Sequence, residues 1–306
     1  MPSRCLATWV RRADGLRYRV IVDRRADDPI SRAFRNRQGH LLSAPLVDLM
    51  LEILRPGDLF VDLGAHIGTF SIPAAAAGAE VLAVEASSTN VELLRVSAAR
   101  NGFSNLRVVH AAAADRTGSV RFHESGPWGH VVKGNRTAPR VRSVRLDELI
   151  DVRGTRMALI KLDVEGFEPF AIDGMSRLLS REDAPAVLYE SNGHCLAFHE
   201  FTPGDLRERL KRFGYASYSI EPGRLVRIRP NDIQPQTVID CLAVKHRPAL
   251  RAWRVTRPLT RREWLTRIRR EARHPHPHHR AYVARVLAGA GEDILRRLGI
   301  STKKTL

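Results

Sequence analysis

The feature that most constrains the fold is a short apolar strand that runs directly into a glycine-containing turn. The strand covers residues 59–63, and the turn Gly64-Ala-His-Ile-Gly68 leads into a helix rich in small side chains. A strand, a tight turn and a helix in this order begin a unit in which successive strands lie parallel. Similar apolar runs alternate with helical patterns as far as about Val244. The sequence therefore predicts an α/β fold built on a largely parallel sheet.

The remaining predicted elements follow the same alternation of strand-length and helix-length patterns. A serine at residue 87 or 88 begins one helix, and Asn101-Gly102 ends it with a left-handed cap. Strands are predicted at residues 18–22, 81–84, 106–109, 119–122, 141–144, 159–162, 186–189, 215–220 and 237–244, and helices at 45–54, 89–100 and 203–213.

The positive charge is concentrated at one end of the chain. The 306 residues carry a formal charge of +17, and residues 245–306, with 17 Lys and Arg against four acids, hold +13 of it. This asymmetry divides the chain into a lead-in or cap (1–56), an α/β domain (57–244) and a basic, mainly helical extension (245–306). The positive charge predicts that the extension contacts phosphates, an anionic membrane surface or an acidic partner. The alternative is that the apolar face of the extension packs on the α/β domain and its arginines are solvated.

Two helices are predicted in the extension. Thr260-Arg-Arg-Glu263 has the spacing of a capping box, and a second helical pattern covers residues 281–298. Between them lie the histidines of Arg273-His-Pro-His-Pro-His-His279. Prolines separate these histidines and no other ligand type accompanies them, so adventitious metal binding is favoured over a designed site.

The cysteines and the apolar segments limit the class of protein. Cys5, Cys195 and Cys241 are too few and too scattered for a disulfide framework or a four-cysteine zinc site, which favours a reducing compartment. The first residues lack the apolar region of a signal peptide, and no run approaches the ~18 apolar residues of a membrane span. We therefore expect a cytoplasmic location.

Two acids accompany the glycine turn and indicate the charge of its ligand. Asp62 precedes the turn, and Glu85 follows 23 residues later at the end of the next strand, where an acid suits a ribose diol. The spacing is Asp-x-Gly-x-x-x-Gly, and a carboxylate at Asp62 would repel the pyrophosphate of a dinucleotide. S-adenosylmethionine carries an ammonium and a sulfonium and no phosphate. The two acids therefore predict S-adenosylmethionine as the cofactor, against the alternative of a βα turn that needs glycine only for packing.

Several segments between residues 45 and 244 resemble the FkbM-type S-adenosylmethionine-dependent methyltransferases. They are Pro56–Gly68, Val84-Glu85-Ala86, Ala113–Gly118, Val144-Arg-Leu-Asp147 and Ile160–Glu168. The resemblance implies a Rossmann-like, seven-stranded class I methyltransferase sheet and transfer of a methyl group to a hydroxyl of a sugar, glycan or secondary metabolite. It places Asp62, Gly64 and Gly68 near the methionine end of the cofactor and Glu85 on the ribose.

The matching segments contain further candidates for cofactor binding. We include His66, Ala86 and Asp115 among the predicted cofactor-binding residues. Members of the family usually carry asparagine where this chain has His66, so the detail of the turn is expected to differ here.

The segment Lys161-Leu-Asp163-Val-Glu165-Gly166 supplies the predicted catalytic acids. It places two carboxylates at the carboxyl end of a core strand, where open α/β sheets bind ligands. Asp163 is predicted to orient the acceptor or take its proton, with Glu165 second. The alternative is that one acid caps the helix near Glu168 and the other pairs with Lys161.

A third polar group follows the next strand on the same edge. Glu190 is a third candidate acid, and His194 is a candidate general base near neutral pH, against the alternative of a surface-loop histidine. Three acids at strand ends also predict an Mg²⁺ site if they converge.

Two other functions remain open at this stage. The acceptor is RNA or DNA if the basic extension holds phosphates, although aromatic residues make up only 6% of the chain and offer few stacking surfaces. The same O-methyltransferase docked through residues 245–306 on a membrane or an acidic partner is the third hypothesis.

Overall fold

A computed structural model describes residues 5–263 except 37, 40–42, 135–136, 152–155, 233, 235–237, 247–249 and 261–262. The predicted capping box is confirmed at the end of this range. The side chain of Glu263 accepts from the backbone N–H of Thr260 (2.6 Å), and the Thr260 hydroxyl accepts from the N–H of Glu263 (3.3 Å). The rest of that helix, the histidine-rich segment and the second predicted helix lie outside the described residues.

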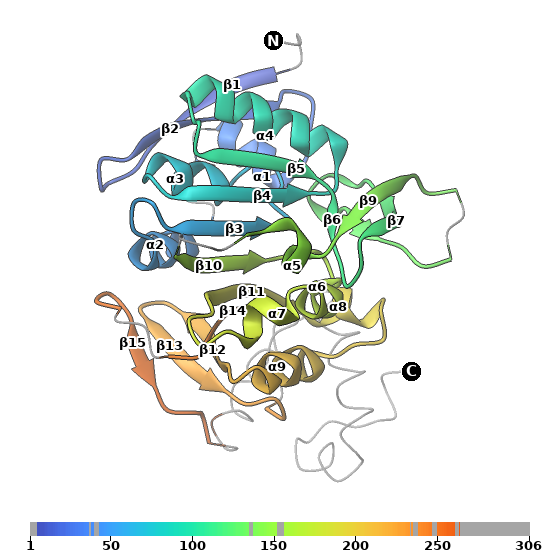
Figure 1. Cartoon of the computed structure of the whole chain (residues 1–306). Helices are drawn as coiled ribbons and strands as arrows, with labels where there is room; N and C mark the ends of the chain where they lie inside the picture. The colour runs from blue at the N-terminus through green and yellow to red at the C-terminus, as the bar shows by residue number, and fades with distance from the viewer. Residues whose placement is uncertain are drawn as a thin grey trace, which may run out of the picture.

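Within the described part of the chain, the largest sheet has nine strands in the order β15-β13-β12-β14-β11-β10-β3-β4-β5 (Figure 1). The bounds are β3 Leu59–Leu63, β4 Glu80–Glu85, β5 Leu106–His110, β10 Met157–Leu162, β11 Ala186–Asn192, β12 Ala216–Glu221, β13 Arg224–Ile228, β14 Val238–Val244 and β15 Arg254–Thr256. The strands from β11 to β5 pair in parallel, and β14 lies antiparallel between β11 and β12. The α/β fold is confirmed, and β13 and β15 extend the seven expected strands at one edge.

Both faces of the sheet are covered, which is the usual condition for parallel strands. Side chains alternate along each strand, so that Phe60 and Leu159 face one core while Val61 and Ile160 face the other. Helices α1 (Pro29–Arg35), α2 (Ala44–Ile53), α3 (Ser71–Ala76) and α4 (Ser88–Asn101) pack in the first core; α5 (Leu146–Leu149), α6 (Glu168–Asp173), α7 (Ser176–Ser180), α8 (Gly193–Ala197) and α9 (Pro203–Arg212) pack in the second.

Helix α4 begins and ends where the sequence predicts. The Ser87 side chain accepts from the backbone N–H of Asn90, and Gly102 caps the other end with φ of +69°. No helix among the described residues is long and apolar enough to span a membrane.

Two smaller sheets accompany the main one in the described residues. Strands β6 (Ala112–Ala113), β7 (Gly118–His123), β8 (His130–Val131) and β9 (Arg140–Val144) form a sheet that projects from the main one, with the short helix η2 (Gly126–Trp128) before β8 (Figure 1). A hairpin of β1 (Cys5–Arg11) and β2 (Arg17–Asp23) packs on α4. The projecting sheet lies beside the carboxyl ends of β3, β4 and β10, where the predicted site residues are.

Candidate active site

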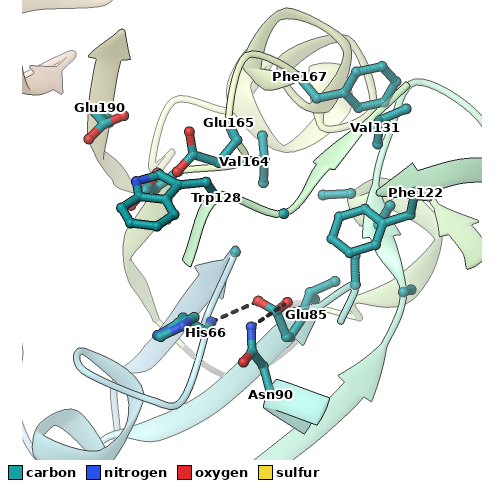
Figure 2. A pocket seen from close by; sticks show the side chains of 18 of the residues that line it. His66, Glu85, Asn90, Phe122, Trp128, Val131, Val164, Glu165, Phe167 and Glu190 are labelled. Atoms are coloured by element: carbon teal, nitrogen blue, oxygen red, sulfur yellow. Dashed lines mark hydrogen bonds between the residues drawn. The ribbon is translucent and has the colours of Figure 1, made fainter. Parts of the chain in front are cut away.

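A cavity of about 300 Å³ opens between the carboxyl ends of the central strands and the projecting sheet. Its volume is in the range of small-molecule sites. In Figure 2, Glu85, His66 and Asn90 form one side, Glu165 and Glu190 lie across the hollow, and Phe122 and Val131 of the projecting sheet close a third side. The cavity therefore lies at the sheet edge predicted from the sequence.

Glu85 is a buried carboxylate that the local backbone holds in place. Its Oε2 accepts from the backbone N–H of His66 (2.8 Å), and its Oε1 accepts from the N–H of Ser87 (2.8 Å) and from the side-chain amide of Asn90 (3.4 Å). Burial raises its pKa, while the backbone donors oppose that shift. The three hydrogen bonds use three of the carboxylate's about four lone-pair sites, so Oε2 keeps one acceptor site free.

The glycine turn holds two strands in close contact. Gly64 has φ of +78°, and a Cβ placed on it would lie 1.7 Å from the carbonyl oxygen of Asp163. Only glycine fits at this point, where the turn after β3 crosses the segment after β10. The turn therefore fixes the cofactor side of the cavity against the segment that carries the candidate acids.

His66 adopts a left-handed backbone conformation, with φ of +50°. Asparagine and histidine are both enriched in this conformation, so His66 meets the same backbone requirement as the asparagine usual in the family. Desolvation lowers the pKa of His66 to about 4, which keeps the ring neutral at pH 7.

Asp62 is fully buried and does not line the cavity. Its Oδ2 accepts from the hydroxyl of Ser71 (2.6 Å), and its Oδ1 lies 4.0 Å from Nζ of Lys161. Burial raises its pKa, and the Lys161 charge opposes that effect. Asp62 thus lies next to Lys161, whose ammonium donates to Asp163 in the cavity wall.

The two predicted acids after β10 both line the cavity. Asp163 accepts a hydrogen bond from Nζ of Lys161 (2.9 Å), so the predicted alternative of a pairing with Lys161 is present as well. Glu165 has φ of +52°, which turns the chain directly after the strand, and it accepts from Sγ of Cys195 (3.2 Å). Desolvation, with a smaller effect from Asp163, raises the pKa of Glu165 to about 7.

Neighbouring carboxylates make this part of the protein strongly acidic. Glu190 lines the cavity, and burial together with Asp163 and Glu165 raises its pKa well above the usual value. Burial also raises the pKa of Glu168 to about 7 and that of Asp240 to about 6. Lys161 is the cation placed among these groups, and its pKa is raised because the attraction of Asp163 and Asp62 outweighs its own desolvation.

The structure brings together part of the predicted site. Gly64, His66, Glu85, Ala86, Asp163, Glu165 and Glu190 line the cavity, whereas Asp62, Gly68, Asp115 and His194 do not. Gly68 packs against Leu94 and Ile72, the backbone carbonyl of Asp115 accepts from Arg145, and His194 lies on α8 with its ring against Phe198. Cofactor contact by Asp62, Gly68 and Asp115 and catalysis by His194 stay predictions.

Several lining residues were missed from the sequence. Asn90 lies in the first turn of α4. The Ser87 side chain accepts from its backbone N–H, and the Asn90 side-chain amide donates to Glu85. The segment 111–113 lines the cavity directly after β5. Phe122 and Val131 lie on the projecting sheet and Trp128 lies on η2 between its strands. The alternation of apolar residues in these strands does not indicate that the sheet packs against the site.

The charge of the lining indicates what the cavity accepts. Among the described residues that line it are four carboxylates, from Glu85, Asp163, Glu165 and Glu190, and neither a lysine nor an arginine. The raised pKa values of Glu165 and Glu190 reduce this negative charge near neutral pH, but no cationic side chain of the described lining offsets it. The lining therefore suits a cationic, phosphate-free ligand, and S-adenosylmethionine meets that requirement. Within the same described residues, no group of three or more His, Cys, Asp or Glu side chains is arranged to hold a metal ion, so the predicted Mg²⁺ site finds no support.

Comparison with known families agrees with this chemistry. The family model "Methyltransferase FkbM domain" matches residues 62–217, which is about half of the chain. The protein belongs to the FkbM methyltransferase family. The resemblance noted in the sequence is thereby confirmed, and this FkbM methyltransferase uses S-adenosylmethionine as its methyl donor.

Curated relatives match over a shorter stretch. A 23S rRNA (uracil(1939)-C(5))-methyltransferase RlmD of Shewanella sp. (strain MR-4) is 34% identical over 99 residues, covering 30% of this chain and 22% of the relative. The corresponding enzyme of Halomonas elongata is 53% identical over 51 residues, covering 17% of this chain and 11% of the relative. The chain thus spans about a fifth or less of the length of these relatives.

Solved structures show only a distant likeness. The 16S rRNA N2 G1207 methyltransferase RsmC of T. thermophilus aligns with a TM-score of 0.43 and 15% identity, over 80% of this chain and 52% of that one. A TehB-like S-adenosylmethionine-dependent methyltransferase of Corynebacterium glutamicum aligns with a TM-score of 0.40 and 13% identity, over 70% and 97%.

Proposed function

We propose that this FkbM methyltransferase methylates a hydroxyl group of a small-molecule or glycan acceptor. The observation that carries the proposal is the position of Glu165, which faces the cavity across from Glu85 (Figure 2) and has a pKa raised to about 7. A carboxylate with this pKa is half ionised near neutral pH, which suits a general base.

Glu85 is the residue assigned to the cofactor. Its two oxygens are fixed by the N–H groups of His66 and Ser87, so that a ribose hydroxyl meets a free acceptor site on Oε2 that is already oriented. Asn90 fixes the same carboxylate from α4. Asp62 acts at a distance through Lys161 in this proposal, and Gly64 allows the close approach of the turn to the segment after β10.

S-adenosylmethionine supplies a methyl group on a positively charged sulfur; its transfer to a hydroxyl breaks a C–S bond, forms a C–O bond and releases one proton. Glu165 accepts that proton as the acceptor oxygen forms its new bond. Asp163, held by Lys161, accepts a hydrogen bond from the acceptor and orients it. The acidic lining attracts the cationic ligand and so contributes to its binding.

The test compares Glu165→Gln with Asp183→Asn, an exposed carboxylate on the loop after α7 that serves as a matched control. Transfer of labelled methyl groups into separated polysaccharide, lipid, RNA and small-metabolite fractions first identifies the acceptor class. With that acceptor, Glu165→Gln is expected to lower kcat about 10²- to 10⁴-fold. Binding of S-adenosylmethionine, measured by calorimetry, should stay within threefold, and Asp183→Asn should change neither quantity.

The pH profile provides a second readout. If Glu165 is the base, kcat/KM of the wild type falls about tenfold for each pH unit below about 7 and levels off above it. Full turnover by Glu165→Gln, or a profile that is flat between pH 5 and pH 8, would contradict the proposal.

A second candidate function is methylation of RNA. The partial match to RlmD and the charge of +13 on residues 245–306 favour it. In this alternative, residues 57–244 form the catalytic domain and the extension holds phosphates. Strand β15 and the buried Trp253 belong to the sheet edge, so the informative truncation removes residues 264–306 only. Label in the RNA fraction that disappears on this truncation would support RNA; label in a small-molecule or glycan fraction that persists would support the O-methyltransferase.

A further inference from the structure

Two large aromatic side chains are exposed: Trp128, which lines the cavity, and Phe198, which stacks on His130, two residues after Trp128. Trp128 is 57% exposed and Phe198 is 55% exposed, and they account for two of the four large hydrophobic side chains that are exposed in the described part of the chain. Exposed aromatic groups that gather near a cavity mark a binding surface more often than isolated ones do. Trp128 also lines the cavity itself (Figure 2).

His130 connects these two residues, which come from different elements: it forms a hydrogen bond with the backbone of Trp128 and a ring contact with Phe198. Nδ1 of His130 forms a hydrogen bond with the carbonyl oxygen of Trp128 (2.9 Å), and the His130 ring stacks on Phe198 with centroids 6.0 Å apart at 15°. His194 meets Phe198 edge-on, with centroids 4.9 Å apart. We call Trp128, His130, His194 and Phe198 the ring platform; it runs from the cavity across β8 to α8.

The charges around the platform favour a ligand without negative charge. The carboxylates of Asp163, Glu165 and Glu190 line the cavity that Trp128 borders. The ammonium of Lys133 lies 3.9 Å from the carboxylate of Glu200, which offsets its charge. A phosphate or carboxylate on the ligand would therefore meet acidic groups inside the cavity.

We propose that the ring platform binds the methyl acceptor, and that the acceptor presents a flat apolar ring face and carries no phosphate or carboxylate. This inference rests on the proposed hydroxyl methylation and adds the acceptor's class. Aromatic side chains bind such faces, whether they belong to a sugar ring or to an aromatic ring. Binding of the ring on the platform brings its hydroxyl group toward Glu165, because Trp128 belongs to both the platform and the cavity wall.

The test uses the full chain and four variants. Phe198→Ala removes a ring that does not line the cavity, Phe198→Leu keeps apolar bulk without a ring, Trp128→Ala removes the shared ring, and Trp9→Ala removes an equally exposed ring (53%) on the β1–β2 hairpin as a control. Methyl transfer is measured on methyl glycosides and on substituted phenols, each offered in a neutral form and as a phosphate monoester. The two compound sets distinguish a sugar from an aromatic source of the ring.

The platform predicts a change in KM and not in the chemical step. Phe198→Ala, Phe198→Leu and Trp128→Ala should each raise the acceptor KM about tenfold with kcat within threefold, whereas Trp9→Ala should match the wild type. Neutral compounds should be preferred at least tenfold over their phosphate monoesters. Unchanged KM in both Phe198 variants, or a preference for the phosphorylated compounds, would overturn the inference.

A second measurement separates this inference from the proposed function. If the wild type methylates none of the hydroxyl compounds, the proposed function fails for these acceptors, and their binding is then followed by saturation-transfer NMR. Binding by the wild type that Phe198→Ala weakens would still support the platform. Equal binding by the two proteins, or no binding of any neutral ring compound, would refute it.

Discussion

Glu168 offers a direct test of how burial sets the charge state of this site. Its side chain is 1% exposed, Oε1 accepts from the backbone N–H groups of Val164 (3.0 Å) and Gly166 (3.2 Å), and Oε2 has no hydrogen-bond partner among the described residues. Burial raises its pKa from 4.5 to about 7. An acid whose pKa is higher in the folded state holds its proton more tightly there. The free energy of unfolding therefore falls as the pH rises from about 4.5 to about 7.

The size of this effect follows from the two pKa values. A difference of about 2.5 units corresponds to about 3 kcal/mol of stability lost between pH 4.5 and pH 7. Glu168→Gln removes that loss, because glutamine stays neutral and its amide oxygen still accepts from the two N–H groups. The amide nitrogen of glutamine would occupy the position of Oε2, where no hydrogen-bond partner is present among the described residues. This buried, unpaired donor lowers the free energy of unfolding by about 1 kcal/mol at every pH.

The assay is urea unfolding at intervals from pH 5 to pH 8. At pH 5 the wild type has already lost about 0.8 kcal/mol, so Glu168→Gln should be about as stable as the wild type there and about 2 kcal/mol more stable at pH 8. Glu182→Gln, an exposed change near α7, serves as the control and should show a difference that does not vary with pH. A pH-independent difference for Glu168→Gln as well would refute the reasoning from burial.

Two further predictions concern the cofactor side of the cavity. Gly64→Ala should lower the free energy of unfolding by more than about 2 kcal/mol and abolish S-adenosylmethionine binding, because its Cβ would lie 1.7 Å from a backbone carbonyl oxygen. The control Gly57→Ala has a similar φ of +83° and nothing within 4 Å of the added Cβ. It should lower the free energy of unfolding by only about 1–2 kcal/mol, measured by thermal melting. Glu85→Ala should weaken S-adenosylmethionine binding at least tenfold by calorimetry and lower stability by about 1–3 kcal/mol, because the N–H groups of His66 and Ser87 lose their acceptor; normal affinity would remove the ribose assignment.

The central sheet could be predicted because its strands obey local rules. Strand β3 matches the predicted residues 59–63, and α4 ends at Gly102 as expected, since caps and buried runs depend on neighbours in sequence. The carboxyl-end rule for parallel strands likewise placed Glu85 and Glu165 at one cavity. These features can be predicted without knowing which residues far apart in the sequence are in contact.

The rest of the site depends on contacts between distant segments. Burial of Asp62 follows from Ser71 and Lys161, which lie on other elements, and no spacing within the turn signals it. The position of Trp128 depends on how β7 and β8 fold back beside the main sheet. Strands β13 and β15 extend one edge of the sheet. Their sequences, such as Arg224–Ile228, are short and contain charged residues, so their pattern does not predict strands.

The projecting sheet gives the cavity two walls of separate origin. Glu85 and Gly64 belong to the central strands, whereas Phe122, Trp128 and Val131 belong to a segment inserted between β5 and β10. We therefore expect that replacing this inserted segment alters which acceptor is methylated, under the binding mode proposed above, and leaves Glu85 and Gly64 in place on the central strands.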